Sequence, residues 1–287
     1  MKHTHRLHGI AQACAIFALS VCLSQAVQAE AKPDDDLLKD WTLSGGLVHS
    51  RSERSSDVAP SRNWANSFVF SGVKRHDDKF SYGGSLAYSR GKATTASDDG
   101  TTDTKVMSGS LFAMRLIDHL ILLNANLSYG DVDLDNTHMS GANTVTFDGD
   151  SSFWALGVGA TKIVPFANGV TATASANYNF SYADSESYSD SAGGRTPGDT
   201  TTRNTIALGG GVSWRIDDRW TPNAKLSWHY SPSRLYNGTN DRDYFSYAVG
   251  TSYALLPDTK LSAAYRGAFA KTDTRDHALS LTVSVAF

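Results

Sequence analysis

The sequence predicts an all-β fold, a 12-stranded antiparallel transmembrane β-barrel of the outer-membrane type. From Trp41 onward, apolar residues recur at every second position, which is the period of a strand with one apolar face. The segments between these strands alternate between short and long, as in bacterial outer-membrane barrels. Beyond the first thirty residues, no apolar run reaches the roughly 18 residues that a membrane-spanning helix requires.

Residues 1–29 are predicted to be a secretory signal peptide. Lys2 and Arg6 form a basic start, residues 10–23 are apolar, and the segment ends in the small-x-small sequence Val-Gln-Ala at Ala29. We therefore expect cleavage between Ala29 and Glu30 after Sec-type export. Residues 30–40 then form a short periplasmic or lumenal segment, and residues 41–287 form the barrel.

Composition narrows the functional classes further. Both cysteines, Cys14 and Cys22, lie in the predicted signal peptide, so the mature chain is expected to have no disulfide and no thiol chemistry. The formal charge of −3 argues against a nucleic-acid partner, which would require a basic stripe. The 12 tyrosines, 12 phenylalanines and 6 tryptophans argue against disorder, because so many aromatic side chains need an apolar environment.

Twelve segments carry the strand pattern. The clearest is residues 170–182, with seven apolar residues on one face and small polar residues on the other. That run exceeds the 5–6 residues of an ordinary strand, as a tilted membrane-crossing strand must. In chain order, the expected strands are 41–50, 63–74, 80–88, 104–116, 121–129, 152–164, 170–182, 206–216, 224–230, 245–253, 261–269 and 277–287.

The connections between these strands differ in length. Short turns are expected at 76–78, 118–119, 165–169, 217–218 and 257–258, where Asp, Pro and Gly gather. Long loops are expected at 51–62, 91–103, 131–151, 184–203 and 232–243, with a smaller one at 271–276. An even strand number places both chain ends on the short-turn side, which is the periplasm.

The C-terminus resembles the β-signal of bacterial outer-membrane proteins. The pattern consists of alternate apolar residues that end on an aromatic: Leu279, Leu281, Val283, Val285 and Phe287. The resemblance implies that periplasmic chaperones and the barrel-assembly machinery are partners during biogenesis. Until the barrel closes, this strand is a free edge that is open to pairing with another chain.

Three stretches together resemble the β-domain of autotransporters, the type V secretion family. They are 70–73 (Phe-Ser-Gly-Val), 79–89 and 122–133, the last with Ser-Tyr-Gly at 128–130. The likeness covers nearly the whole mature chain and includes the strand count and Phe287. It implies an outer-membrane barrel that carries an N-terminal passenger. Because only residues 30–40 precede the first strand, we expect a barrel without a passenger.

The alternation predicts a lumen lined by Ser, Thr, Ala, Gly and Asn, with few charges. The candidate lumenal charges are Arg215, Lys225 and Arg266, with His229 nearby. Barrels of about eight strands are filled by their own side chains, so twelve strands with small inward residues are expected to leave a cavity. Either water fills that cavity and makes a narrow pore, or the acidic segment 30–40 occupies it against these cations.

The mature chain has no recognisable catalytic motif, and no catalytic, cofactor-binding or metal-binding residue is predicted. Its histidines are scattered, and no Cys/His spacing fits a metal site. Aspartates of the outer loops, such as Asp131 and Asp133, would lie at the level of the lipopolysaccharide headgroups. They are read first as turn-forming residues and only second as ligands for divalent cations.

The sequence therefore predicts a monomer in the outer membrane of a Gram-negative bacterium, with membrane lipids and lipopolysaccharide as its partners. The predicted role is a narrow pore or a surface-exposed structural or adhesive protein. The alternative is an outer-membrane lipid hydrolase of the phospholipase or lipid A deacylase type.

Overall fold

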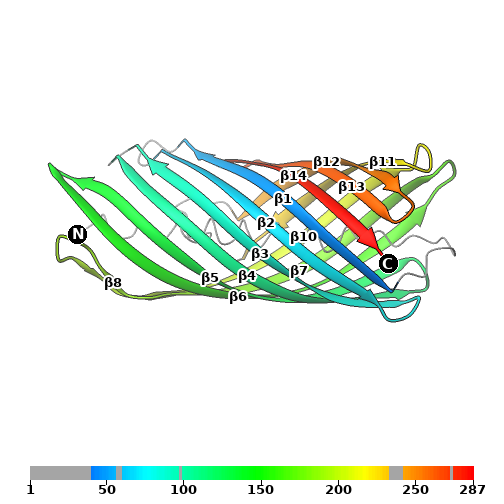
Figure 1. The fold of residues 1–287 in the computed structure, drawn as a ribbon, viewed down its shortest axis with the longest axis horizontal. Helices are drawn as coiled ribbons and strands as arrows, with labels where there is room; N and C mark the ends of the chain where they lie inside the picture. The colour runs from blue at the N-terminus through cyan, green and yellow to red at the C-terminus, as the bar shows by residue number, and fades with distance from the viewer. Residues whose placement is uncertain (1–39, 56–59, 97–98, 233–241, 272–273) are drawn as a thin grey trace.

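A computed structural model of the chain describes residues 40–55, 60–96, 99–232, 242–271 and 274–287. Twelve antiparallel strands form one closed barrel, and a two-stranded hairpin lies at one end of it (Figure 1). The predicted fold class is confirmed. The predicted signal peptide, its cleavage site at Ala29 and Glu30, and residues 30–39 lie outside the described residues.

The strands follow one another around the barrel in chain order. The barrel strands are β1 (Trp41–Arg54), β2 (Ser61–Arg75), β3 (Phe80–Thr95), β4 (Gly100–Ile117), β5 (Ile121–Ser140), β6 (Asn143–Pro165), β7 (Val170–Ser185), β10 (Asp199–Trp214), β11 (Trp220–Tyr230), β12 (Asp243–Leu256), β13 (Thr259–Phe269) and β14 (Thr274–Ala286). The hairpin consists of β8 (Tyr188–Ser189) and β9 (Arg195–Thr196).

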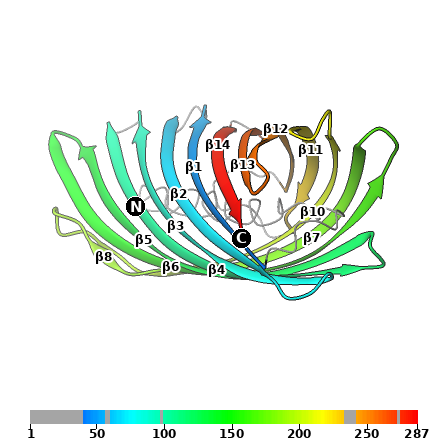
Figure 2. The ribbon, with the colours of Figure 1, turned by 45° about the vertical axis from the view of Figure 1, so that its right-hand side comes forward.

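The barrel closes between its first and last strands, which lie side by side in Figures 1 and 2. The register runs from Thr42 opposite Ala286 to Arg54 opposite Thr274. At the end of this seam, the Phe287 amide donates to the Trp41 carbonyl at 2.9 Å, and the Trp41 amide donates to the Phe287 carbonyl at 3.1 Å. Closure leaves no strand edge in the barrel, which is the condition for a sheet to cross a membrane.

The two faces of the wall alternate along every strand. Outward side chains such as Phe68, Leu86 and Leu111 are 60–68% exposed, whereas inward neighbours such as Val106 and Ala278 are 5% exposed or less. A soluble protein would not leave such a band of large apolar residues in water, so the outer band is a lipid-contacting surface. No helix in the described part of the chain has the length and apolar character to cross a membrane.

Aromatic residues flank the apolar band on the outer wall. Near the short-turn end, Trp220 packs against Tyr253 with ring centroids 4.7 Å apart. Near the other end, Trp154 lies between Phe180 and Tyr182 at 5.1 and 6.1 Å. Rings that are apolar in body and polar at the edge are favourable where hydrocarbon meets water.

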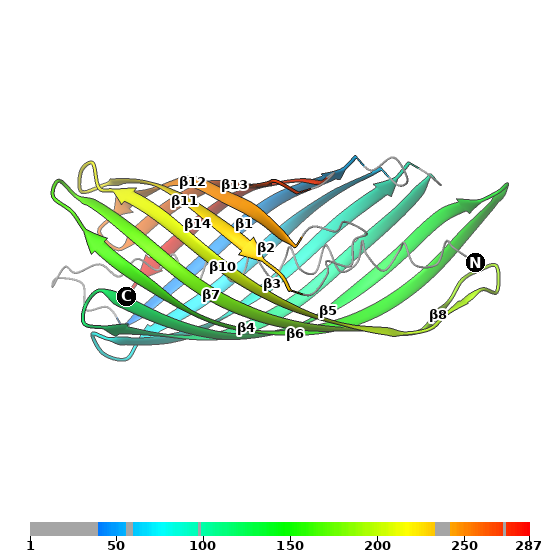
Figure 3. The same cartoon turned by 180° about the vertical axis from the view of Figure 1, so that it is seen from behind.

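Strands extend into four of the expected long loops, and this corrects the sequence interpretation. Strand β5 ends only at Ser140 and β6 already begins at Asn143, so only a two-residue turn remains of the loop expected at 131–151. Strand extensions also shorten the segments expected at 51–62 and 91–103. The β8–β9 hairpin occupies part of the fourth, 184–203, and lies at the end of the barrel opposite the C-terminus (Figures 1 and 3). The fifth, 232–243, lies mostly outside the described residues.

In these extensions the alternation is reversed relative to the membrane-crossing part of the strands: apolar residues face inward and polar residues face outward, which stabilises them in water. Val132, Leu134 and Phe153 point inward and form a buried cluster with Val106, while aspartates point outward to water. The Tyr188 ring of β8 stacks on Phe147 at 4.2 Å and so covers this apolar inner face. Above the membrane the outer face meets water instead of lipid, and the polar residues therefore change sides.

Glycines allow aromatic rings to lie flat on the inner wall at two positions. A Cβ on Gly130 would lie 2.5 Å from the Phe153 ring and 2.8 Å from the Met107 carbonyl oxygen. A Cβ on Gly83 would lie 2.8 Å from the Phe112 ring. A side chain at either position would displace the ring or the neighbouring strand, so these positions require glycine for close approach.

Two of the short turns share one device. The Asp77 carboxylate accepts the amides of Lys79 and Phe80, both at 2.7 Å, and the Asp217 carboxylate accepts those of Arg219 and Trp220 at 2.8 and 2.6 Å. In each case the aspartate lies three residues before a strand begins. These amide hydrogen bonds hold the pKa of both carboxyl groups below the ordinary value of 3.8.

This device predicts a pH-dependent contribution to stability. An aspartate whose pKa is lowered on folding stabilises the fold above its ordinary pKa, and this contribution is lost as the pH falls through the lowered pKa. We therefore expect Asp217→Asn to lower the free energy of unfolding at neutral pH, and the deficit to shrink below about pH 4. Denaturant unfolding in lipid vesicles at several pH values measures this difference. A deficit that does not change with pH would contradict the mechanism.

Candidate functional site

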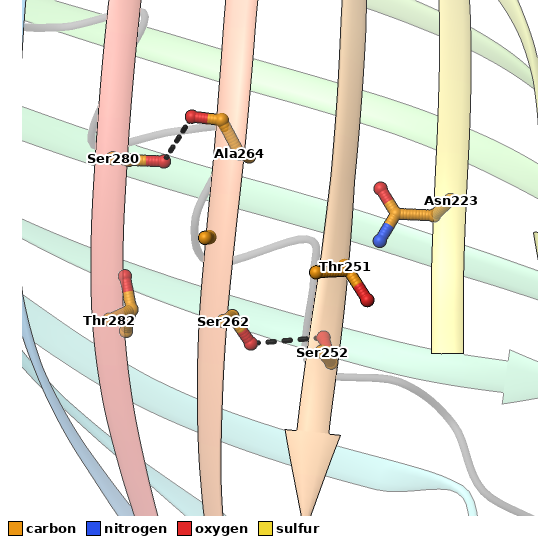
Figure 4. Close-up of a pocket in the computed structure, with 8 residues that line it drawn as sticks. Asn223, Thr251, Ser252, Ser262, Ala264, Ser280 and Thr282 are labelled. Carbon is orange, nitrogen blue, oxygen red and sulfur yellow. Dashed lines mark hydrogen bonds between the residues drawn. The ribbon is translucent and has the colours of Figure 1, made fainter. Parts of the chain in front are cut away.

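The lumen is the candidate functional site, because its wall brings together the polar inward residues of twelve strands. Near the short turns, one recess in the wall of β11–β14 is lined by small uncharged groups (Figure 4). Ser252 and Ser262 share a hydrogen bond of 2.9 Å, and Ser280 donates to the Ala264 carbonyl at 3.3 Å. The recess between these side chains measures about 10 Å³, which is the space of one water molecule.

The wall formed by β5, β6 and β7 is lined by carboxamides. Asn126 and Asn179 lie beside Gly157, and the missing glycine side chain makes the room that they occupy. Asn124 and Asn177 are placed in the same way around Gly159. The side-chain oxygen of Asn124 and nitrogen of Asn126 are buried without a hydrogen-bond partner among the described residues. Neutral amides of this kind interact with either sign of charge.

Two of the three predicted lumenal charges lie together. Lys225 on β11 pairs with Ala248 on β12, which pairs in turn with Arg266 on β13. Arg266 then pairs with Ala278, which is 5% exposed on the inner face of β14. Because paired residues share one face of a sheet, Lys225 and Arg266 both face the lumen, with only the methyl group of Ala248 between them.

The third predicted charge, Arg215, does not join them. It follows Trp214, the last residue of β10, and is exposed in the turn before β11. Its amide donates to the Gly169 carbonyl at 2.9 Å, which places it at the short-turn rim of the barrel. The expectation that segment 30–40 plugs the lumen against these cations concerns residues that, except for Asp40, are outside the described part of the chain.

The sequence interpretation missed another lumenal cation, Arg203. It shares the inward face of β10 with Ala207 and Gly211, and Gly211 pairs with Lys225. Its Nε atom is buried without a hydrogen-bond partner among the described residues. The two-residue alternation continues back from residue 206 to 203 and indicates that Arg203 faces inward. The sequence interpretation instead places residue 203 in a long loop.

Among the described strand residues, the inner face carries more cations than carboxylates. The register places six cationic residues on the inner face of the described strands: Arg54, Arg75, Arg203, Lys225, Lys260 and Arg266. Only two carboxylates share that face among the described residues, Asp199 at the start of β10 and Asp276 on β14. Asp276 is paired with Lys271 and accepts a hydrogen bond from Ser52 at 2.6 Å.

A contact network lies on the inner wall toward the end opposite the short turns. The His229 ring stacks on Tyr244 at 4.5 Å, and its Nε2 lies 2.8 Å from Ser246 Oγ. The Lys271 ammonium lies 4.5 Å from the centre of the Tyr244 ring. A hydrolytic triad contains a histidine next to a serine, together with a carboxylate that orients the histidine. Among the described residues, no carboxylate hydrogen bonds to His229. The pair faces the lumen and not the lipid.

The aspartates expected at headgroup level do lie on the outer face of the wall. Asp135 is opposite Asp103 on one side and Asp148 on the other, and Asp133 is opposite Lys105 and Asp150. Lys105 approaches Asp135 at 3.6 Å. Within the described ranges, no group of three or more acidic, histidine or cysteine side chains has the geometry to hold a metal ion.

The outer wall near the short turns carries an apolar groove of about 760 Å³. Its outward-facing lining includes Phe80, Ala125, Val158, Tyr178 and Ile206. This apolar lining agrees with a lipid-facing surface.

The residues of the predicted β-signal form the outer face of β14. Leu279, Leu281, Val283 and Val285 are 40–57% exposed on that face, and Phe287 follows the strand at 57%. Leu281 is opposite Leu47 of β1 and Ala263 of β13. The structure therefore places these residues at the closing seam, with their side chains toward lipid.

Comparisons with known proteins agree on one family. A family model described as the autotransporter beta-domain matches residues 43–266, which is more than half of the chain. The translocator domain of the autotransporter NalP from Neisseria meningitidis superposes with a TM-score of 0.87 at 12% identity, over 100% of both chains. A search of curated proteins gives no match.

Two other solved barrels are also similar. The β-domain of the Bordetella autotransporter BrkA has a TM-score of 0.72 at 18% identity, over 86% of this chain and 100% of that one. The transport unit of the autotransporter AIDA-I from Escherichia coli has a TM-score of 0.64 at 10% identity, over 94% and 97%. These structural matches share the fold with this chain. None of the comparisons supports the alternative of a lipid hydrolase.

Proposed function

Because the chain belongs to the autotransporter β-domain family, we propose that its barrel is a narrow water-filled passage across the membrane. The protein is an integral barrel of the Gram-negative outer membrane. Membrane lipids therefore surround it, and general barrel-assembly machinery inserts it. We extend this to a monomer that contacts lipopolysaccharide and is escorted by periplasmic chaperones.

The observation that supports a passage is the lining of the lumen. Most inward positions of the described strands carry Gly, Ala, Ser, Thr or Asn, which take little space and offer hydrogen bonds to water. A barrel of twelve strands is wider than the eight-stranded barrels that side chains fill, so these small groups leave room for water. The same lining would let an extended polypeptide slide past, and the similar NalP barrel is called a translocator domain.

Conductance in planar lipid bilayers tests this proposal. Chain 30–287, refolded in detergent and added to one side, is expected to give discrete current steps. A variant that also lacks residues 30–39 shows whether that segment limits the current. If neither protein conducts while both run as folded, heat-modifiable barrels on gels, the passage proposal is wrong.

A surface-exposed structural or adhesive role is the second candidate, and the β5–β6 hairpin favours it. This hairpin extends past the apolar band and carries exposed carboxylates on its outer face, including Asp133, Asp135 and Asp148. Such a rigid acidic extension fits contact with the cell surroundings. This role does not account for conductance, so the bilayer measurement also separates the two candidates.

A further inference from the structure

We infer that the lumen of this barrel selects anions, through a cationic wall formed by Arg203, Lys225 and Arg266. This inference rests on the proposed passage, because selectivity requires conduction. It adds the class of solute that the passage prefers. It follows from where the strands place charge.

The cationic wall is confined to one side of the barrel. Lys225 and Arg266 face the lumen from β11 and β13 across the methyl group of Ala248. Arg203 lies on β10, whose Gly211 is the partner of Lys225. The wall of β5–β7 contributes no charge at the level of the amides Asn124, Asn126, Asn177 and Asn179. An ion in the lumen therefore passes between fixed positive charge and neutral dipoles.

No carboxylate of the described residues forms an ion pair with Arg203 or Lys225. Among the lumen-facing positions of β11, β12 and β13 that the structure describes there is no aspartate or glutamate. Asp199 is the first residue of β10, four residues from Arg203, and Asp276 is engaged by Lys271 and Ser52. Asp243 lies on the outer face, where it accepts a hydrogen bond from Trp228 at 3.3 Å.

Arg203 and Lys225 carry the inference. The Nε atom of Arg203 is buried without a described hydrogen-bond partner, and the amphipathic stem of Lys225 projects into the lumen between two residues that lack a long side chain, Gly211 and Ala248. A low-dielectric wall around such charges concentrates counter-ions in a narrow passage. Rings or rows of Arg and Lys give anion preference to other membrane pores by the same physics.

The expected effect of one charge is measurable. In water, a unit charge about 7 Å from a passing ion changes the local concentration of that ion about threefold, in opposite directions for anions and cations. We therefore expect chain 30–287 in a potassium chloride gradient to give a reversal potential of the sign that reports chloride preference. Because the two ions change in opposite directions, Lys225→Gln and Arg203→Gln are each expected to reduce the chloride-to-potassium permeability ratio about sevenfold.

Lys162→Gln is the matched control. Lys162 is exposed on the outer face of β6, opposite Ile121 of β5, so this substitution removes the same charge from the other side of the wall. It is expected to leave the permeability ratio unchanged. Heat-modifiable gel mobility confirms that each variant is folded before its current is recorded.

A second measurement needs no substitution. Screening shortens the reach of the wall charges from about 10 Å at 0.1 M salt to about 3 Å at 1 M. The chloride preference of the unmodified chain is therefore expected to fall between these concentrations. Discrete currents without anion preference, or with preference for potassium, would overturn this inference and leave the passage intact. The absence of any current would instead refute the passage itself.

Discussion

Replacing Leu111 by arginine is expected to prevent stable insertion of the barrel. Leu111 is 68% exposed on the outer face of β4, between Gly84 of β3 and Leu127 of β5, near the middle of the apolar band. An arginine at the bilayer midplane of a barrel costs about 2–4 kcal/mol, because its charge leaves water for hydrocarbon. Such a loss is a large part of the stability of a typical domain. Refolding into lipid vesicles, followed by urea titration and heat-modifiable mobility, measures it.

Ser110→Arg is the control for this substitution. Ser110 is the neighbouring residue on β4 but faces the lumen, where its hydroxyl pairs with that of Ser85 at 2.6 Å. The arginine there points into the polar interior, so only the loss of one hydrogen bond, about 1 kcal/mol, is expected. Equal loss of folding in both variants would mean that the outer face is not in contact with lipid.

The fold was predictable because its main signal is geometric. A closed wall between lipid and water requires apolar and small polar residues to alternate, and segments such as 170–182 do so without interruption. The closing pair was also readable, because β14 ends on alternate apolar residues. The ends of the strands could not be predicted, because above the membrane the outer face meets water and the inner face carries apolar residues. There Val132 and Leu134 point inward and Asp131, Asp133 and Asp135 outward, and the composition is that of a loop.

The candidate site was predictable only where the alternation had already been assigned. Lys225 and Arg266 lie within clear strands, and counting residues places them inward. Arg215 follows the same count, but β10 ends at Trp214, so this residue lies in the turn after the strand. Arg203 was missed because its part of β10 was taken as loop. A one-residue error at a strand end assigns a side chain to the wrong face of the sheet or to the wrong element. Charged residues near strand ends can therefore be placed only when the register of the strands is known.

Replacing Leu281 by proline is expected to prevent closure of the barrel. Leu281 lies in the middle of β14, opposite Leu47 of β1 and Ala263 of β13, so β14 has a hydrogen-bonded neighbour on both sides. Proline lacks the amide that the ladder needs, and its ring disturbs the neighbouring strand. In hydrocarbon, a carbonyl left without its donor costs several kcal/mol, because no water replaces it. Loss of heat-modifiable mobility and of protease resistance in outer-membrane fractions would report the failure.

Leu281→Ile separates the backbone from the side chain in this experiment. Isoleucine keeps the amide, the apolar outer face and the pattern that ends on Phe287, so this variant is expected to assemble normally. The seam between β1 and β14 joins residues about 240 positions apart, as the Ser44–Ser284 hydrogen bond of 2.8 Å illustrates, and it forms only when the other strands are in place. A proline variant that still formed a closed barrel would show that the seam tolerates an unpaired backbone position. The requirement for complete backbone pairing in the membrane would then be wrong for this barrel.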